Sequence, residues 1–315
     1  MPLVSVFMKS YNHERFISEA IESVLRQDFE DLELIIVDDA STDASRQIIE
    51  RYAKQDSRIR AIFHKCNLGI TRVVNDGIEA ARGRFIAQID SDDIWERNKL
   101  RKQLAVLENN EDLIVWSEGE LIDEAGRLMG KTFSQFAGSE RKKKSGDIFQ
   151  ALIEAPFIFG ASLLYKRENI GDLRYDERLS YLNDYKFVLE LASNYQFCYI
   201  DEPLARYRMH GKNTLASRGP EAAKRHRRAY AEEICVRQEA LRNFDTRVLN
   251  ETKAHIYAND GICYRRLGEN RQALSSYLQA IKCNRRSWSN LAYSAHVLEL
   301  MAENLLGMRI FLEKS

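Results

Sequence analysis

The first 95 residues alternate short apolar runs with segments of helical periodicity, and this alternation constrains the fold more than any other feature of the sequence. The apolar runs lie at residues 4–8, 34–37, 60–63 and 85–89. Between the first two runs, apolar side chains recur every three or four positions, at Phe16, Ile17, Ala20, Ile21, Val24 and Leu25. Strands that alternate with helices of about a dozen residues predict an α/β fold with a mainly parallel sheet that is covered on both faces.

Three carboxylates, Asp90, Asp92 and Asp93, directly follow the fourth apolar run. Carboxylates this close repel one another, so we expect a cation or a hydrogen-bonding partner beside them. Asp38 and Asp39 follow the second run in the same way. Because ligands in such sheets bind beyond the carboxyl ends of the strands, both acidic clusters should face one crevice.

Simpler interpretations of the acidic residues account for only part of the pattern. Asp93 could cap a following helix, as Ser41 or Thr42 is expected to do after the second strand, but a cap needs only one such side chain. A calcium loop of the EF-hand type is excluded, because Trp95 and Arg101 stand where it needs Gly and Glu. We therefore favour a site for a divalent metal and a diphosphate, since hard oxygen ligands suit Mg²⁺ or Mn²⁺.

Composition narrows the class of protein. The chain has 315 residues and zero net charge, so its overall charge does not indicate nucleic-acid binding. Its five cysteines lack the short spacings of a zinc site, and their odd number argues against a disulfide scaffold, so the cytoplasm is the expected location. Neither a signal peptide nor an apolar run of about 18 residues is found, which predicts a soluble protein or one attached at most to the inner face of the membrane.

Beyond Trp116 the regular alternation breaks down. Residues 126–146 contain several Gly and Ser and the basic run 141–144, which predicts a solvated loop or, alternatively, a mobile flap that helps to hold phosphates. Further elements are expected as a strand at 162–165, a helix at 183–192 and a strand at 195–200.

Strand patterns end near Gly219, so we expect an α/β domain at residues 1–218 and a helical region at 219–315. Lys and Arg outnumber Asp and Glu in the helical region, where residues 224–228 form a basic cluster. Residues 257–284 place Gly, Ala and Tyr much as a tetratricopeptide repeat does, and a single repeat must stack on helical neighbours. The helices either dock the protein onto a partner or an anionic membrane, or cover an apolar face of the first domain.

Five motifs follow one another along about residues 3–215. They are Val4-Ser-Val-Phe-Met-Lys-Ser-Tyr-Asn12, Ile36-Val-Asp-Asp-Ala-Ser-Thr-Asp43, Asn67-Leu-Gly69 with Asn75, Asp90-Ser-Asp-Asp-Ile-Trp95, and Asn183-Asp184 with Tyr207-Arg-Met-His210. Together these motifs resemble the family 2 glycosyltransferases of the GT-A fold. The resemblance implies a Rossmann-like nucleotide-diphospho-sugar transferase of the hexosyltransferase class.

The metal-binding Asp-x-Asp signature of that family matches Asp90-Ser91-Asp92. The resemblance therefore implies Mn²⁺ or Mg²⁺ held by Asp92, together with Asp90, Asp93 and His210. A lone histidine is more often structural than a ligand. The match of His210 to the Tyr-Arg-x-His motif of the family reverses that expectation.

The resemblance also implies the residues that bind the donor. Asp39 would read the nucleotide base, and uracil is the commonest base in the family, so a UDP-sugar is the expected donor, with thymidine and guanosine donors left open. The residues expected to bind the donor are Ser10, Tyr11, Asn12, Asp38, Asp39, Asn67, Gly69, Arg72, Asn75, Asp90, Ser91 and Arg208. Trp95 is expected to pack against the following helix, with contact to the acceptor as the alternative.

Asp184 matches the carboxylate that deprotonates the acceptor hydroxyl in the family. The family usually has Glu where this chain has Asn183, so the surroundings of Asp184 differ in charge. A carboxylate at a helix start is well placed as a base and stays ionised there. No second carboxylate stands out as a sugar nucleophile, so we expect a single displacement with inversion. The expected acceptor is a saccharide or a lipid-linked glycan of bacterial surface polysaccharide synthesis, and the oligomeric state is left open.

Competing functions lack their own sequence signals. A sugar nucleotidyltransferase or a dinucleotide-dependent oxidoreductase needs a Gly-rich phosphate loop after the first strand, and residues 8–13 contain no glycine. A scaffold with an inert front domain would be expected to lose the carboxylates, and all of them are present.

Overall fold

The computed structural model describes residues 1–140, 144–211, 213 and 220–284. The chain divides into two compact units, one of residues 1–149 with 156–217 and one of residues 150–155 with 218–315. Residues 150–155 were predicted to belong to the first domain, whereas the structure groups them with the helices.

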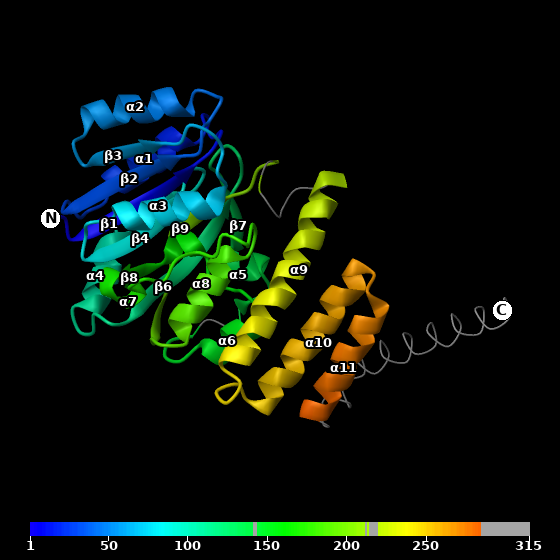
Figure 1. Cartoon of the computed structure of the whole chain (residues 1–315). Helices are drawn as coiled ribbons and strands as arrows, with labels where there is room; N and C mark the ends of the chain where they lie inside the picture. The colour runs from blue at the N-terminus through cyan, green and yellow to red at the C-terminus, as the bar shows by residue number, and fades with distance from the viewer. Residues whose placement is uncertain (141–143, 212, 214–219, 285–315) are drawn as a thin grey trace. The chain divides into compact units, whose positions relative to one another are not determined.

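Within the described part of the first unit, nine strands form one sheet (Figure 1). Its order is β3 (Ile59–Phe63), β2 (Leu32–Asp38), β1 (Val4–Ser10), β4 (Phe85–Asp90), β8 (Leu164–Lys166), β6 (Ile114–Ile122), β9 (Phe197–Arg208) and β5 (Ile94–Trp95), with β7 (Leu128–Thr132) beside β6. The first four strands in this order are parallel, as is the pair β6 and β9. Strand β8 runs antiparallel to both of its neighbours, and β5 and β7 are antiparallel additions. The predicted α/β architecture with a mainly parallel sheet is confirmed.

Helices cover both faces of the strands. On one face, side chains of α1 (Ile17–Leu25), α2 (Ser45–Gln55) and α4 (Lys99–Leu107) share a core with alternate residues of β1. On the other face lies α3 (Ile70–Ala80), on the near side of the sheet in Figure 1. A Cβ atom at Gly77 of α3 would lie 2.9 Å from Phe7 Cβ, so the close approach of this helix to β1 requires glycine.

The predicted cap of the second helix is wrong, and the alternative in which Asp93 only caps a helix is excluded. Helix α2 begins at Ser45, and the backbone N–H of Ser45 donates to Asp43 Oδ1 rather than to Ser41 or Thr42. Helix α4 begins at Lys99, because the short strand β5 intervenes after Asp93. The carboxylate of Asp93 is therefore not used as a cap.

The later elements match the prediction in part. Helix α8 (Asn183–Ala192) has the expected bounds. Residues 126–146 were expected to be irregular, but they contain β7 and the short helix α5 (Phe133–Phe136), and residues 141–143 of the basic run lie outside the described residues. The remaining short elements are α6 (Phe149–Glu154), the 3-10 turn η2 (Gly160–Ser162) and α7 (Arg167–Ile170).

The described helices of the second unit are α9 (Pro220–Asn243), α10 (Asn250–Leu267) and α11 (Asn270–Cys283). Helices α10 and α11 form a hairpin whose turn contains Gly268 in the left-handed conformation (φ 82°), a common helix terminator. Residues 150–155 join this unit through the side chain of Glu154, which lies 3.0 Å from His255 Nδ1. The resemblance of residues 257–284 to a tetratricopeptide repeat stays a prediction.

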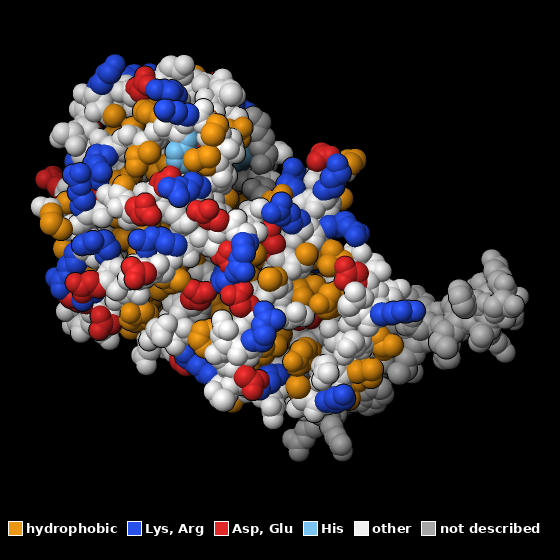
Figure 2. All heavy atoms as spheres, viewed as in Figure 1, with side chains coloured by type: hydrophobic (Ala, Val, Ile, Leu, Met, Phe, Trp, Pro, Cys, Tyr) orange, Lys and Arg blue, Asp and Glu red, His pale blue; other side chains and the backbone are white. Residues whose placement is uncertain are grey.

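Basic side chains of α9 have partners within the helical unit. Lys224 pairs with Glu221, and Arg228 pairs with Glu232. On the face shown in Figure 2, basic and acidic side chains are interspersed over both units. None of the helices in the described ranges is long and apolar enough to cross a membrane.

Candidate active site

The carboxyl ends of three neighbouring parallel strands carry polar residues and lie together at one end of the sheet. Ser10 of β1 is in register with Asp38 of β2, and Lys9 of β1 is in register with Asp90 of β4. The two acidic clusters therefore meet at one edge, as the sequence predicted. The side-chain contacts at this edge show how each residue is held.

Lys9 supplies a positive charge that the carboxylate cluster requires. Its Nζ lies 2.7 Å from Asp90 Oδ1. Burial by itself lowers the pKa of Lys9, but its ion pair with Asp90, together with the smaller effects of Asp184 and Asp93, raises that pKa above the usual value. Lys9 was not among the predicted site residues, because nothing in its sequence context indicates which carboxylate it faces.

Asp92 is the point where two histidines converge. His210 Nε2 lies 2.9 Å from Asp92 Oδ2, and His13 Nδ1 lies 3.9 Å from Asp92 Oδ1. Burial by itself raises the pKa of Asp92, but the hydrogen bond with His210 and the nearby His13 lower it below the usual value. The ligand atoms of His13, Asp92 and His210 all lie within 4.8 Å of one another, so this donor set fits a divalent metal ion.

Asp93 has a different environment from Asp92. Its Oδ1 accepts the backbone N–H of Arg208 at 3.1 Å, while its buried Oδ2 has no hydrogen-bond partner among the described residues. Burial and the charges of Asp92 and Asp90 raise the pKa of Asp93 well above its usual range. Neither Asp90 nor Asp93 belongs to the group of converging ligand atoms, so their predicted metal contacts remain predictions.

The guanidinium of Arg208 is buried and bonded to protein groups. It donates to the backbone oxygen of Asp92 at 2.8 Å and to the side chain of Glu19. It also reaches the backbone oxygens of Asp123 and Glu124. These contacts favour a role in positioning Asp92 over the predicted contact with the diphosphate.

The loop after β1 is fastened to the loop after β2. Asp38 accepts hydrogen bonds from Ser10 Oγ at 3.0 Å and from the backbone N–H of Ser41 at 2.9 Å. Asn12, in the left-handed conformation (φ 55°), accepts the backbone N–H of Thr42 at 2.8 Å. Three predicted donor-binding residues are thus brought together, while the neighbouring Tyr11 is exposed.

Asp39 fastens the turn at residues 67–69. Its Oδ1 accepts the backbone N–H of Leu68, and its Oδ2 accepts that of Gly69, both at 2.8 Å. A carboxylate oxygen has two lone pairs, so Oδ2 retains capacity for a donor on a nucleotide base. Asn67 lies beside it and donates to the backbone oxygen of Asp39 at 3.5 Å.

His64, which the sequence analysis missed, lies between two carboxylates. Its Nδ1 is 2.7 Å from Asp39 Oδ1, and its Nε2 is 2.8 Å from Asp76 Oδ2. Burial by itself lowers the pKa of His64, but the hydrogen bonds with Asp39 and Asp76 outweigh burial and raise it. His64 thereby holds the carboxylate that is expected to read the base.

Two residues of α3 that were predicted to bind the donor have side chains bonded to other residues of this chain. Both ends of the Asn75 amide bond the backbone of Tyr175, at 2.8 and 3.0 Å. Arg72 is half-exposed and pairs with Asp76 at 2.9 Å. Asn75 therefore anchors the segment that leads to α8.

Asp184 stands in the first turn of α8 and accepts the backbone N–H of Tyr185 at 2.7 Å. Its neighbour Asn183 is buried and donates to Thr71 Oγ1, which ties the helix start to α3. Burial raises the pKa of the Asp184 carboxyl above its usual value, Lys9 counteracts this effect, and Asp90 adds to it. A raised pKa suits a general base that must hold a proton near neutral pH.

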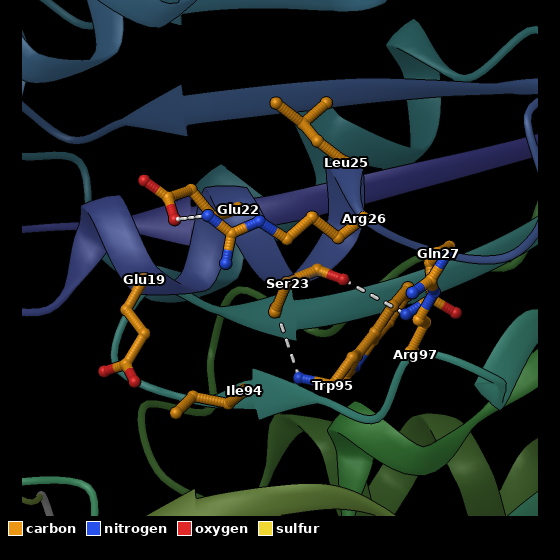
Figure 3. A pocket seen from close by; sticks show the side chains of 9 residues that line it. All are labelled: Glu19, Glu22, Ser23, Leu25, Arg26, Gln27, Ile94, Trp95 and Arg97. Carbon is orange, nitrogen blue, oxygen red and sulfur yellow. Dashed lines mark hydrogen bonds and ion pairs between the residues drawn. The ribbon is translucent and has the colours of Figure 1, made fainter.

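Trp95 is buried and packs against Lys99 of the following helix, with Nζ 4.1 Å from the ring centroid. Its indole N–H donates to the backbone oxygen of Ala161 at 2.9 Å. The predicted packing role is confirmed. The edge of this tryptophan also lines an open groove of about 500 Å³ between α1 and β5, where the Ser23 hydroxyl accepts the Trp95 backbone N–H (Figure 3).

Residues 5–174 match the model of glycosyl transferase family 2. An uncharacterized glycosyltransferase of Methanocaldococcus jannaschii is 34% identical over 69% of this chain and 74% of its own length. The chain belongs to glycosyl transferase family 2. It is a glycosyltransferase, and it transfers a sugar from a nucleotide-sugar.

Other relatives extend the comparison. The putative glycosyltransferase EpsH of Bacillus subtilis is 34% identical over 66% of this chain and 61% of its own length. The putative teichuronic acid biosynthesis glycosyltransferase TuaG, also of B. subtilis, is 46% identical over 33% of this chain and 41% of its own length.

Solved structures show the fold of this glycosyltransferase. TarS residues 1–349 of S. aureus, in complex with UDP-GlcNAc, has a TM-score of 0.58 at 17% identity and matches 92% of each chain. The mannosyltransferase PcManGT of Pyrobaculum calidifontis, in complex with GDP-Man and Mn²⁺, has a TM-score of 0.57 at 16% identity and matches 96% of this chain and 81% of its own. The predicted GT-A fold followed by C-terminal helices is confirmed.

Proposed function

We propose that this glycosyltransferase transfers a sugar from a UDP-sugar to a hydroxyl group of a saccharide or lipid-linked glycan, with inversion at the anomeric carbon. The observation that carries the proposal is the convergence of Asp92 and His210 at the end of β4, together with a carboxylate at Asp184 whose pKa is raised. Lys9 interacts electrostatically with both Asp184 and Asp90, so the candidate base lies near the strand end that carries the proposed metal ligands.

The side chains divide the work of the reaction. Asp39 and the turn at residues 67–69 hold the nucleotide base. The loops after β1 and β2, which are hydrogen-bonded to each other, support it from below. Lys9 pairs with Asp90 and orients its carboxylate. Asp184 takes the proton from the acceptor hydroxyl as that oxygen attacks the sugar, and holds it while the diphosphate leaves on the opposite side.

Asp92 and His210 would hold Mn²⁺ or Mg²⁺, which when bound would neutralise charge on the leaving diphosphate. The Mn²⁺ in the complex of PcManGT and the UDP-GlcNAc in that of TarS support this assignment of donor and metal. The buried Arg208 keeps the backbone of Asp92 in place, because its guanidinium donates to the Asp92 oxygen.

The acceptor belongs to surface polysaccharide synthesis in this proposal. Support comes from the similarity to TuaG, which is described as a putative teichuronic acid biosynthesis glycosyltransferase. A basic helical region at the inner face of the membrane would bring the enzyme to a lipid-linked glycan, and each exposed Lys or Arg near anionic lipid contributes about 1 kcal/mol. The ion pairs of Lys224 and Arg228 reduce the charge available for such contact.

The replacement Asp184→Asn tests the base. Because Asn cannot accept the proton, transfer should fall by roughly 10² or more, the range lost with a general base. UDP affinity, measured by calorimetry in the presence of Mn²⁺, should stay within a few-fold of the wild type, since the hydrogen bonds described for Asp184 are with its chain neighbours Asn183 and Tyr185.

The matched control is Asp172→Asn, which removes an exposed carboxylate from the same unit and should leave both measurements unchanged. Transfer that survives in Asp184→Asn would show that another carboxylate acts as the base.

A further inference from the structure

His13 is a residue to which none of the five motifs gives a role. It lies in the loop after β1, where its backbone N–H donates to Ser45 Oγ at 3.0 Å. Its ring Nδ1 lies 2.8 Å from the buried Ser91 Oγ, and the ring stands edge-on to that of His210, with centroids 5.7 Å apart. Phe16 packs against both imidazoles, at 6.1 and 4.9 Å. The side chain is therefore held in one orientation beside the carboxylates.

The position of His13 relative to Asp92 is the decisive feature. One oxygen of Asp92 faces His210 at 2.9 Å, and the other faces His13 at 3.9 Å. A hydrogen bond between Asp92 and His210 accounts for the first contact, but 3.9 Å is too long for a hydrogen bond and leaves His13 beside the carboxylate without touching it. The three ligand atoms all lie within 4.8 Å of one another, so the three side chains are close enough together to converge on one ion.

We propose that His13 is a third protein ligand of the divalent metal, and that this second imidazole gives the site a preference for Mn²⁺ over Mg²⁺. The inference rests on the proposed function, which places the metal at Asp92 and His210. Imidazole nitrogen suits transition metals, whereas Mg²⁺ is bound through oxygen and keeps much of its water. A site with two imidazoles and one carboxylate should therefore favour Mn²⁺ over Mg²⁺ more than a site with two carboxylates does.

Ser91 contacts the same imidazole nitrogen of His13 that faces Asp92. Its hydroxyl contacts Nδ1 of His13, and its backbone N–H donates to the Lys9 oxygen at 3.1 Å, so the residue is fixed by β1. Because Nδ1 is also the nitrogen that faces Asp92, a metal ion bound to it would replace the contact with Ser91. The same contact offers the competing explanation, in which His13 only braces Ser91.

Binding of Mn²⁺ separates the two explanations without an activity assay. The free ion is measured by electron paramagnetic resonance during titration of the full chain with MnCl₂, with and without UDP, and Mg²⁺ affinity is measured by competition. His13→Phe keeps a flat ring and removes both nitrogens. This replacement should weaken Mn²⁺ binding by about 10-fold or more, in the range lost on perturbing a metal site. The affinity for Mg²⁺ should change less, so the preference for Mn²⁺ over Mg²⁺ should become smaller.

A spectroscopic signature gives a second readout on the unaltered protein. Electron spin echo modulation from ¹⁴N should indicate two imidazoles bound to Mn²⁺ in the wild type and one in His13→Phe. His255→Phe, which alters a histidine of the helical unit, should change neither measurement. One coordinated imidazole in the wild type, or equal Mn²⁺ affinity in a folded His13→Phe, would overturn the proposal.

The variant Asp92→Asn distinguishes an incorrect role for His13 from an incorrect metal site at Asp92. If Mn²⁺ binding is lost in Asp92→Asn but unchanged in His13→Phe, the metal site stands and the role of His13 is refuted. If Mn²⁺ binds Asp92→Asn as tightly as the wild type, the proposed metal site itself fails.

Discussion

The aspartates of the site carry the same carboxyl group, but their surroundings differ. The pKa of Asp92 is lowered by two histidines despite burial, while burial raises those of Asp93 and Asp184. Divergent pKa values among neighbouring acids are a recurrent way to assign different roles in one active site. An ionised Asp92 suits a metal ligand, and a more basic Asp184 suits proton transfer.

His64 gives a prediction at the scale of the residue. Its protonated ring can donate to Asp39 and Asp76 at once, whereas the neutral ring carries only one N–H. Because its pKa is raised on folding, its contribution to stability is complete below the unfolded pKa of 6.5 and is lost as pH rises through the folded pKa. His64→Gln should therefore lower the free energy of unfolding by about 2 kcal/mol at pH 6 and by less at pH 9.

Urea denaturation at both pH values would measure this difference. His255→Gln, at a half-exposed histidine of the helical unit, controls for loss of an imidazole elsewhere. An equal loss at pH 6 and pH 9 in His64→Gln would contradict the proposed double hydrogen bond.

At the scale of elements, two helices of the catalytic unit bring distant segments to the site. Helix α1 presents Glu19 to Arg208 and Ser23 to the backbone of Trp95, so it braces the segment that contains Asp92 from outside the sheet. Helix α8 carries Asp184, and Asn183 ties its first turn to Thr71. Shifts of either helix should therefore change the geometry of the carboxylates.

The hairpin of α10 and α11 provides a prediction at this scale. Alanine in place of a glycine within a helix ordinarily stabilises by about 1 kcal/mol. At Gly261, however, the added Cβ would lie 2.5 Å from the Tyr277 ring. Gly261→Ala should thus destabilise the helical unit by roughly 1–3 kcal/mol, the usual effect of overpacking.

A double-mutant cycle with Tyr277→Leu would identify the cause. Thermal unfolding should show that Gly261→Ala is neutral or stabilising once the ring is gone, because the contact no longer exists. The same destabilisation in both backgrounds would mean that the Tyr277 contact is not responsible.

At the scale of the whole molecule, each unit has its own buried polar centre. In the catalytic unit it lies at the strand ends, and in the helical unit it is the pair of Arg237 and Asp260, joined at 2.8 Å with both side chains fully buried. Burial raises the pKa of Asp260 to about 6, although the charge of Arg237 opposes this shift. Protonation of Asp260 therefore couples folding of the helical unit to pH.

The direction of this coupling is fixed by the pKa values. Asp260 binds its proton more tightly in the folded chain than at the unfolded pKa of 3.8, so its contribution to stability falls as pH rises from about 4 to about 6. The loss amounts to up to about 3 kcal/mol for a shift of this size. Asp260→Asn cannot titrate, so its stability relative to the wild type should increase across that window, measured by calorimetric unfolding between pH 4 and 7. A constant difference between the two proteins across the window would refute this assignment.

The sequence by itself determined the features that depend on neighbours along the chain. Apolar runs and helical periodicity indicated the strands β1 to β4 and the bounds of α8, because the repeat of a strand or helix is expressed within a few residues. The positions of Asp38, Asp90 and Asp92 at strand ends followed from the same pattern, and with the motifs they indicated the family.

Only the tertiary structure decided which partner each site residue has. Lys9 faces Asp90, His13 approaches Asp92 and His64 joins two carboxylates, and these pairings are set by strand register and by loops far apart in sequence. Asn75 and its partner Tyr175 are separated by 100 positions. A local pattern specifies the conformation of a segment, but hydrogen bonds and pKa values at the site arise between segments, so they are fixed only when the sheet brings those segments together.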